Sequence, residues 1–183
     1  MTTHPRDRHW FLVGLVLAAV ALRLLPHPWN FTPVGAVALF GGAKFRHKGM
    51  ALGIPILAML LSDGYLGFHR LMPFVYGSFL VTTCFGIWLR RSGGVGRVVT
   101  ASVTGTMVFF VVTNFGVWAC LDSYPRNALG LWQCYAAGLP FLRNGLLGDL
   151  FYTAVLFGGL EWAQYRLPWL RDRESRVQAT SWV

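Results

Sequence analysis

Uncharged apolar stretches alternate with short polar ones along the whole chain, and this pattern predicts membrane-spanning helices. The clearest stretch is PFVYGSFLVTTCFGIWLRR at 73–91, in which sixteen uncharged residues, 74–89, are closed by two arginines. Tyr76, Leu80 and Cys84 lie four residues apart, so they would share one stripe of a helix. We expect a membrane helix with a thiol inside it, although a cysteine is also readily buried as ordinary packing.

Five further apolar stretches complete a predicted all-α, integral membrane bundle of six transmembrane helices. Two of the stretches, 34–43 and 50–61, fall short of the roughly 20 residues that cross a bilayer, so they must be tilted, broken or sheltered by neighbours. We expect 121–145 to be the largest loop, with an interfacial or re-entrant helix at 129–142. The other predicted spans are 11–22, 98–120 and 146–160.

Charge predicts how this bundle is oriented. The chain has a net charge of +9, but its basic residues stand in short clusters between apolar runs, which is typical of topology signals and excludes nucleic-acid binding. If the six spans alternate in direction, 12 of the 16 basic residues fall on one side. By the positive-inside rule that side is cytoplasmic, and both termini lie there. A single membrane domain over 1–183 is expected, with a cytoplasmic arm at 1–9, the bundle at 10–165 and a cytoplasmic tail at 166–183.

Polar and aromatic residues gather near the predicted outer ends of the spans. Some of the aromatic residues would belong to an interfacial belt, but polar groups at or inside a span are costly unless they are paired or face a wet cavity. We therefore expect an outward-facing polar pocket. The alternative is an ion pair of Arg143 with Asp149 or Asp63 that closes the bundle. The candidate ligand-binding residues are His27, Asp63, Tyr76, Asn114, Trp118, Arg143, Asn144 and Asp149.

Other motifs give little support for an enzyme or a structural metal site. Cys84, Cys120 and Cys134 are odd in number and lack CxxC spacing, so neither a disulfide framework nor a zinc site is indicated. HExxH, GxSxG and P-loop motifs are all missing from the sequence. Gly14 and Ala18 form one small-xxx-small step in the first span, which would let another helix approach closely, although alanine is also simply common in such spans.

Several motifs resemble a family of small bacterial membrane proteins that includes the BtuM-type vitamin B12 transporters. These motifs are NFTPVGAVALFGG, LLSD, PFVYGSF, TNFGVW and FLRNGLLGDLFYTAVLFGG, which together span residues 30–159. Six short spans with a substrate face of outer loops also resemble the substrate-binding (S) components of energy-coupling-factor vitamin transporters. The resemblance implies uptake of cobalamin across the inner membrane, with an energy-coupling module as a candidate partner at the first helix (Gly14, Ala18).

The resemblance also implies a role for one thiol. Cys84 would coordinate the cobalt of cobalamin from a buried site, replacing the lower axial ligand of the corrin, because cobalt takes a soft thiolate readily. Such a ligand would also assist decyanation of cyanocobalamin. Two alternatives remain open at this point: an S-component-like transporter of another vitamin or precursor, and a structural membrane subunit without transport activity.

Overall fold

The computed structural model describes residues 5–22, 28–90 and 94–170, and the regular structure within these ranges is entirely helical. The prediction of an all-α fold with six helices is confirmed for this part of the chain. Two of the helices, α4 and α5, are long and apolar enough to cross a membrane. The elements are α1 (Pro5–Ala21), α2 (Val34–Lys44), α3 (Lys48–Leu66), α4 (Met72–Leu89), α5 (Val95–Cys120), α6 (Ala128–Arg166) and the 3-10 turn η2 (Pro168–Leu170).

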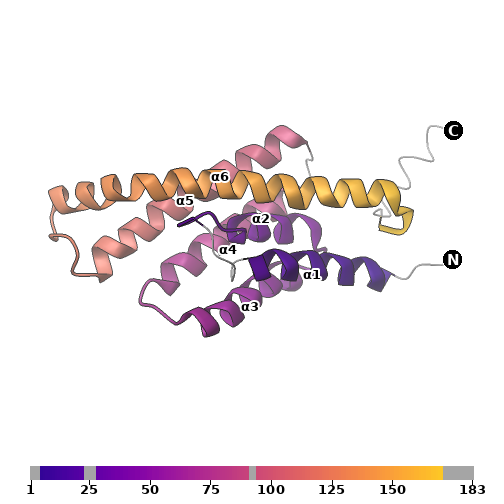
Figure 1. Ribbon diagram of the computed structural model, residues 1–183, viewed down its shortest axis with the longest axis horizontal. Helices are drawn as coiled ribbons and strands as arrows, with labels where there is room; N and C mark the ends of the chain where they lie inside the picture. The colour runs from indigo at the N-terminus through magenta and orange to yellow at the C-terminus, as the bar shows by residue number, and fades with distance from the viewer. Residues whose placement is uncertain (1–4, 23–27, 91–93, 171–183) are drawn as a thin grey trace.

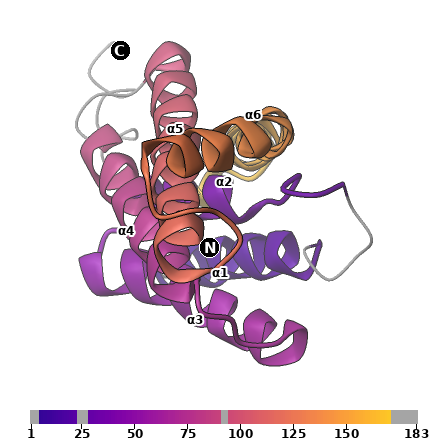
Figure 2. The ribbon, with the colours of Figure 1, turned by 90° about the vertical axis from the view of Figure 1, so that its left-hand side faces the viewer.

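Helix α2 lies at the centre of the molecule and contacts each of the other five helices. The end view in Figure 2 shows it near the middle of the bundle. Its 11 residues span only about 16 Å, roughly half the thickness of a bilayer core. Most of its side chains, from Val34 to Phe40, are buried. A short apolar helix of this kind is stable because its neighbours shelter it, which is one of the arrangements expected for 34–43.

The closest approach between two helices is made by glycines. A Cβ atom added at Gly42 of α2 would collide with the backbone carbonyl of Thr83, and one added at Gly86 of α4 would collide with that of Leu39. Glycine is therefore required on both helices for them to cross at this distance. By contrast, Gly14 of the small-residue step on α1 has open space around it, so docking of a coupling module there stays a prediction.

Helix α6 differs most from the sequence-based expectation. A loop was predicted over 121–145, but the loop ends at Asn127, whose side-chain oxygen accepts a hydrogen bond from the backbone N–H of Gly130 and caps a 39-residue helix. Figure 1 shows α6 running along the whole length of the molecule. Pro140 removes only one backbone donor, and packing of Gly138 and Gly145 against α5 favours a continuous helix. The expected separate helix at 129–142 is therefore wrong.

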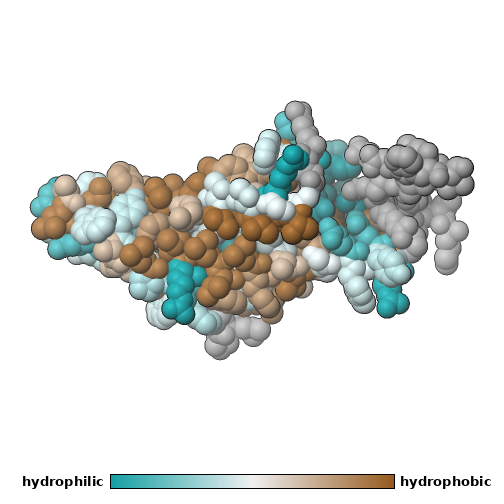
Figure 3. All heavy atoms as spheres, turned by 90° about the horizontal axis from the view of Figure 1, so that it is seen from above, coloured by the Kyte–Doolittle hydropathy of each residue, from teal (hydrophilic) through white to brown (hydrophobic). Residues whose placement is uncertain are grey.

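The surface carries many exposed apolar side chains. Figure 3 shows a broad hydrophobic band between two hydrophilic ends. On α4 the large apolar residues Leu80, Val81 and Trp88 are exposed, whereas Thr82 and Thr83 are buried. These two hydroxyls donate to the backbone carbonyls four residues earlier, at 3.0 and 2.8 Å. In a water-soluble bundle the apolar face would be the buried one; burying small and hydroxyl-bearing residues instead is typical of membrane helices.

The start of α1 and the end of α6 lie at the same end of the molecule (Figure 1). The turn η2 folds back onto α1, where Arg8 Nε donates to the carbonyl oxygen of Leu170 at 3.2 Å and the rings of Phe11 and Trp169 meet edge to face. The segment predicted as an arm at 1–9 is helical from Pro5 onward, because proline suits the first position of a helix.

Candidate functional site

A small cavity lies between the N-terminal end of α2 and the facing sides of α5 and α6. Its volume is about 50 Å³. Aromatic side chains form much of its wall, including Phe79 and Phe109, whose rings stack with centroids 5.2 Å apart. A polar cavity in an otherwise apolar bundle is the first place to look for a ligand site. Its polar lining residues are Asn30, Thr32, Thr106, Thr113, Asn114 and Asp149.

Asp149 of α6 points at the first turn of α2. One of its carboxylate oxygens accepts a hydrogen bond from Thr106 Oγ1 at 2.6 Å, and the carboxylate also bonds the backbone N–H of Ala36. Helix α2 begins after Pro33 and has no side-chain cap of its own. Because the free N–H groups of a helix start attract a negative charge, Asp149 caps α2 from a neighbouring helix. Gly35 is required here, since a Cβ atom would collide with this carboxylate.

Asn114 of α5 lies on the opposite wall of the cavity and contacts both its own helix and α6. Its side-chain amide donates to the carbonyl of Phe110 at 2.8 Å. Its own backbone carbonyl accepts from the thiol of Cys134, which is buried, at 3.3 Å. The extension of α6 beyond its predicted start therefore brings a cysteine into contact with a residue that lines the cavity.

The segment 28–33 closes the cavity from the side of α2. Asn144 Nδ2 of α6 donates to the carbonyl oxygen of Trp29 at 3.0 Å, and the ring of Phe31 lies 5.7 Å from that of Tyr152. Asn30 has a φ angle of 61°, in the left-handed region that asparagine tolerates better than most residues. The segment is thus held to α6 by a few discrete contacts.

Asp63 and Tyr76 form a second polar pair outside this cavity. Tyr76 Oη donates to a carboxylate oxygen of Asp63 at 2.6 Å, and Asp63 is buried within α3. Tyr76 packs with Phe79 and Phe109, the two rings that also form the cavity wall. The structure therefore brings Asn114 and Asp149 to one cavity and leaves Asp63 and Tyr76 in the adjoining cluster.

The remaining candidate binding residues lie at other positions. Arg143 is exposed on α6 and forms no ion pair within the part of the chain that the structure describes, so the pairing with Asp149 or Asp63 that would have closed the bundle is not formed there. Trp118 Nε1 donates to the carbonyl oxygen of Pro125 and fixes the loop before α6. His27 lies outside the described residues.

Cys84 does not occupy the buried site expected of it. Its side chain is exposed, on the same outward face of α4 as Leu80 and Trp88. The buried face of α4 passes through Thr82 and Gly86, and each is two residues from Cys84, which is about 200° around the helix. Of the three residues predicted to share one stripe, Tyr76 contacts buried residues of the bundle, whereas Leu80 and Cys84 are exposed.

Sequence reasoning missed the threonine hydroxyl groups of the cavity, which belong to Thr32, Thr106 and Thr113. Threonine is common in apolar runs, and no single threonine distinguishes itself. The sequence does contain one indication of these hydroxyls. A carboxylate inside an apolar span, such as that of Asp149, requires a hydrogen-bond donor at the same level of the bundle, and a threonine on the preceding long span can supply it.

Comparison with known proteins gives a family but no characterised relative. No curated protein and no solved structure matches the chain. A family of unknown function (DUF6580) matches residues 3–170, which is nearly the whole chain. The chain therefore belongs to this family of unknown function.

Proposed function

We propose that this chain is a multi-pass protein of the bacterial inner membrane that binds a vitamin at its outer end and carries it inward, with cobalamin as the first candidate. The exposed apolar band and the buried hydroxyls support placement in a bilayer. Six spans with both termini in the cytoplasm fit the positive-inside rule, because one end of the bundle collects basic residues. These include Lys44, Arg46, Lys48, Arg90 and Arg97.

The observation that carries the proposal is the polar cavity at the start of the short central helix α2. Transporters commonly place the N-terminus of a discontinuous helix at their substrate site, because its free N–H groups offer polar contacts deep in the membrane. Here that position already holds Asp149, with Asn114 and Thr113 on the facing helix. A purely structural bundle would gain stability from apolar packing at these positions instead.

Binding of a whole vitamin requires the cavity to open. Its volume of about 50 Å³ is far below the roughly 300–1,000 Å³ of ordinary ligand sites. The segment 28–33 is the element we expect to move, because it borders the cavity and is held by discrete contacts such as that from Asn144 to Trp29. Opening would convert the small polar cavity into the floor of a larger outer pocket.

Cobalamin follows from the resemblance of the motifs, and the identity of a cobalt-binding thiol stays a prediction. Cys84 is the residue that the resemblance marks, although it lies on the exposed face of α4. Cys134 is buried and contacts Asn114 of the cavity lining. Replacing each cysteine by serine in turn and recording the cobalt absorption of bound cobalamin assigns the ligand: the spectrum changes only for the variant that removes the coordinating thiol.

Uptake of labelled cobalamin in a bacterial strain that lacks its own cobalamin importer tests the function. We expect accumulation when the chain is expressed, and a loss of uptake for Thr113→Val. Thr104→Val is the matched control, because both threonines donate to a carbonyl four residues earlier on α5 but only Thr113 lines the cavity. Accumulation no greater than without the chain would reject cobalamin as substrate.

Competition by other unlabelled vitamins in the same assay separates the alternatives. If another vitamin is taken up in place of cobalamin, the scaffold is a transporter with a different cargo. If no compound of this class is accumulated while the protein is folded in the membrane, the non-transport structural subunit is the better account.

A further inference from the structure

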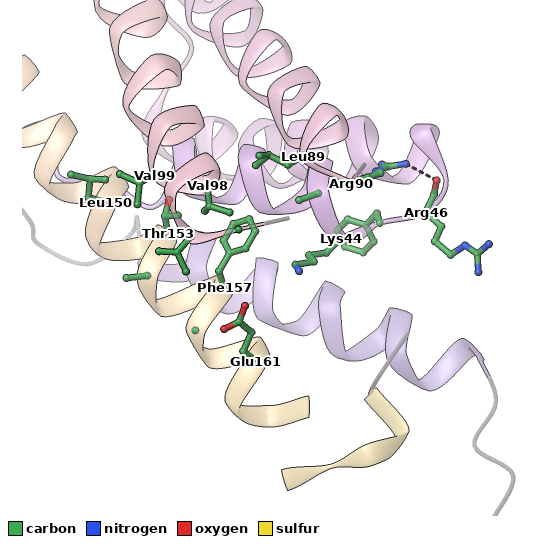
Figure 4. A pocket seen from close by; sticks show the side chains of 16 residues that line it. Lys44, Arg46, Leu89, Arg90, Val98, Val99, Leu150, Thr153, Phe157 and Glu161 are labelled. Atoms are coloured by element: carbon green, nitrogen blue, oxygen red, sulfur yellow. Dashed lines mark hydrogen bonds between the residues drawn. The ribbon is translucent and has the colours of Figure 1, made fainter. Parts of the chain in front are cut away.

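A much larger cavity opens at the opposite, basic end of the bundle. Its volume is about 960 Å³, within the range of ordinary ligand sites. It lies between the C-terminal ends of α2 and α4, the first turns of α5 and the second half of α6, as Figure 4 shows. This basic-end cavity takes no part in the proposed vitamin site, which is at the other end of α2.

One wall of the basic-end cavity is apolar and is made by facing turns of α5 and α6. Val98 and Val99 come from α5, and Leu150, Ala154 and Phe157 come from α6. Val99 is exposed, and so is Ala154, so this wall faces outward rather than into the core. A hydrocarbon chain could lie along it and remove this apolar surface from water.

The rim of the cavity carries three cations and one anion. Lys44, Arg46 and Arg90 come from the ends of α2 and α4, and Glu161 comes from α6. In Figure 4 the two arginines lie together on one side, and Glu161 lies across the cavity from them. A ligand with a negative group on the arginine side would therefore be attracted more than repelled.

Arg90 also has a side-chain donor that lacks an acceptor among the described residues. Its Nε donates to the carbonyl oxygen of Gly42 at 2.7 Å and its Nη1 to that of Arg46 at 2.9 Å. Its Nη2 is buried and has no acceptor within the described residues. Burial also lowers the pKa of the Arg90 guanidinium from its ordinary value. A buried guanidinium N–H is costly to leave unpaired, and a phosphate oxygen is a suitable acceptor for its planar fork.

We propose that the basic-end cavity binds an anionic phospholipid of the cytoplasmic leaflet, with its phosphate beside Arg46 and Arg90 and an acyl chain along the wall of α5 and α6. Basic pockets between membrane helices on the cytoplasmic side are suited to anionic headgroups. The inference rests on the membrane orientation proposed above, since it places this end at the cytoplasmic surface. It does not depend on which vitamin is carried.

Two matched pairs of variants test the lipid site by native mass spectrometry of the full chain. The purified protein is released from detergent that contains equal amounts of phosphatidylglycerol and phosphatidylethanolamine. Gly158→Leu fills the cavity, and Gly159→Leu is its control, because both glycines have open space around them but only Gly158 lines the cavity. Arg46→Ala removes a rim charge, and Arg97→Ala removes an exposed charge nearby that is not part of the lining.

We expect the parent to retain phosphatidylglycerol in preference to phosphatidylethanolamine. Gly158→Leu should lose this retention and Gly159→Leu should keep it. Arg46→Ala should weaken retention about fivefold, the effect expected of one basic residue near an anionic lipid, with little change for Arg97→Ala. Equal retention of both lipids, or equal losses within either pair, would overturn the proposal.

Inorganic phosphate distinguishes the two sources of a phosphate group. If phosphate alone displaces the lipid and binds Gly158→Leu as well as the parent, the site takes free phosphate and the lipid proposal fails. Failure of the membrane placement itself looks different: the protein would then stay soluble and folded without detergent and would retain neither lipid.

Discussion

Removal of the Asp149 carboxylate tests the packing that forms the small cavity at the start of α2. This group caps the first turn of α2 from α6 and accepts a hydrogen bond from Thr106 at 2.6 Å. Substitution by alanine leaves the N–H groups of the α2 start and the Thr106 hydroxyl without this partner. Since α2 contacts all five other helices, a weaker α2 start affects the whole bundle.

The cost can be estimated from the two interactions lost. A hydrogen bond to a charged group contributes about 1.5–3 kcal/mol, and a helix cap about 0.5–2 kcal/mol. We expect Asp149→Ala to destabilise the protein by about 3 kcal/mol, because the two effects share one carboxylate. For a chain of this length that corresponds to a fall of about 6–12 °C in the unfolding midpoint. Asp149→Asn should cost less, since its amide oxygen can still accept a hydrogen bond.

Thermal unfolding in one detergent at one heating rate measures this loss. Glu161→Ala is the control, because it removes an exposed carboxylate from the same helix and should change stability by less than about 0.5 kcal/mol. A double-mutant cycle with Thr106→Val should give a coupling of about 1–2 kcal/mol. An Asp149→Ala midpoint within the error of the parent would refute the capping role, and additive effects in the cycle would refute the contribution of the Thr106 hydrogen bond.

Two further predictions concern contacts between helices. Tyr76→Phe should lower the free energy of unfolding by about 1–3 kcal/mol because it removes a hydroxyl donor from the buried Asp63. Tyr65→Phe, on the exposed side of α3, is the control and should leave stability unchanged. Equal thermal unfolding midpoints for the two variants would contradict the prediction. Gly86→Ala should force α4 away from α2 and cost about 1–3 kcal/mol or more, whereas Gly77→Ala has open space. Size-exclusion profiles of the two glycine variants check this, and identical folded yields would count against it.

The helices could be predicted from sequence because apolar runs and basic clusters are local signals. All six helices lie where an apolar run was recognised. The short run at 34–43 was expected to be tilted, broken or sheltered, and in the structure its neighbours shelter it. The residues of helix α6 were wrongly predicted as a loop followed by a shorter span, because a polar, aromatic stretch at 121–145 looks like a loop until its packing against α5 is known. Continuity of a helix through such a stretch depends on tertiary contacts of glycines, which sequence alone does not specify.

The lining of the candidate cavity was predicted in part, for a related reason. Asp149 and Asn114 could be singled out because polar groups inside apolar spans need partners. Their actual partners, Thr106 and Cys134, follow from the way α5 and α6 face each other, which has no local sequence signal. The inward direction assumed for Cys84 failed because a helix with small, hydroxyl and apolar residues all round does not reveal which side is buried.

Direct binding of cobalamin to the purified chain tests the central proposal most directly. Protein from cells supplied with cobalamin is passed over a size-exclusion column, and absorbance is followed in the visible range, where the polypeptide itself does not absorb. Our account predicts that cobalamin coelutes with the chain in close to equimolar amount, and that Thr113→Val reduces this fraction whereas Thr104→Val does not. Elution of all cobalamin at the position of the free vitamin, from a protein that is folded and monodisperse, would contradict it.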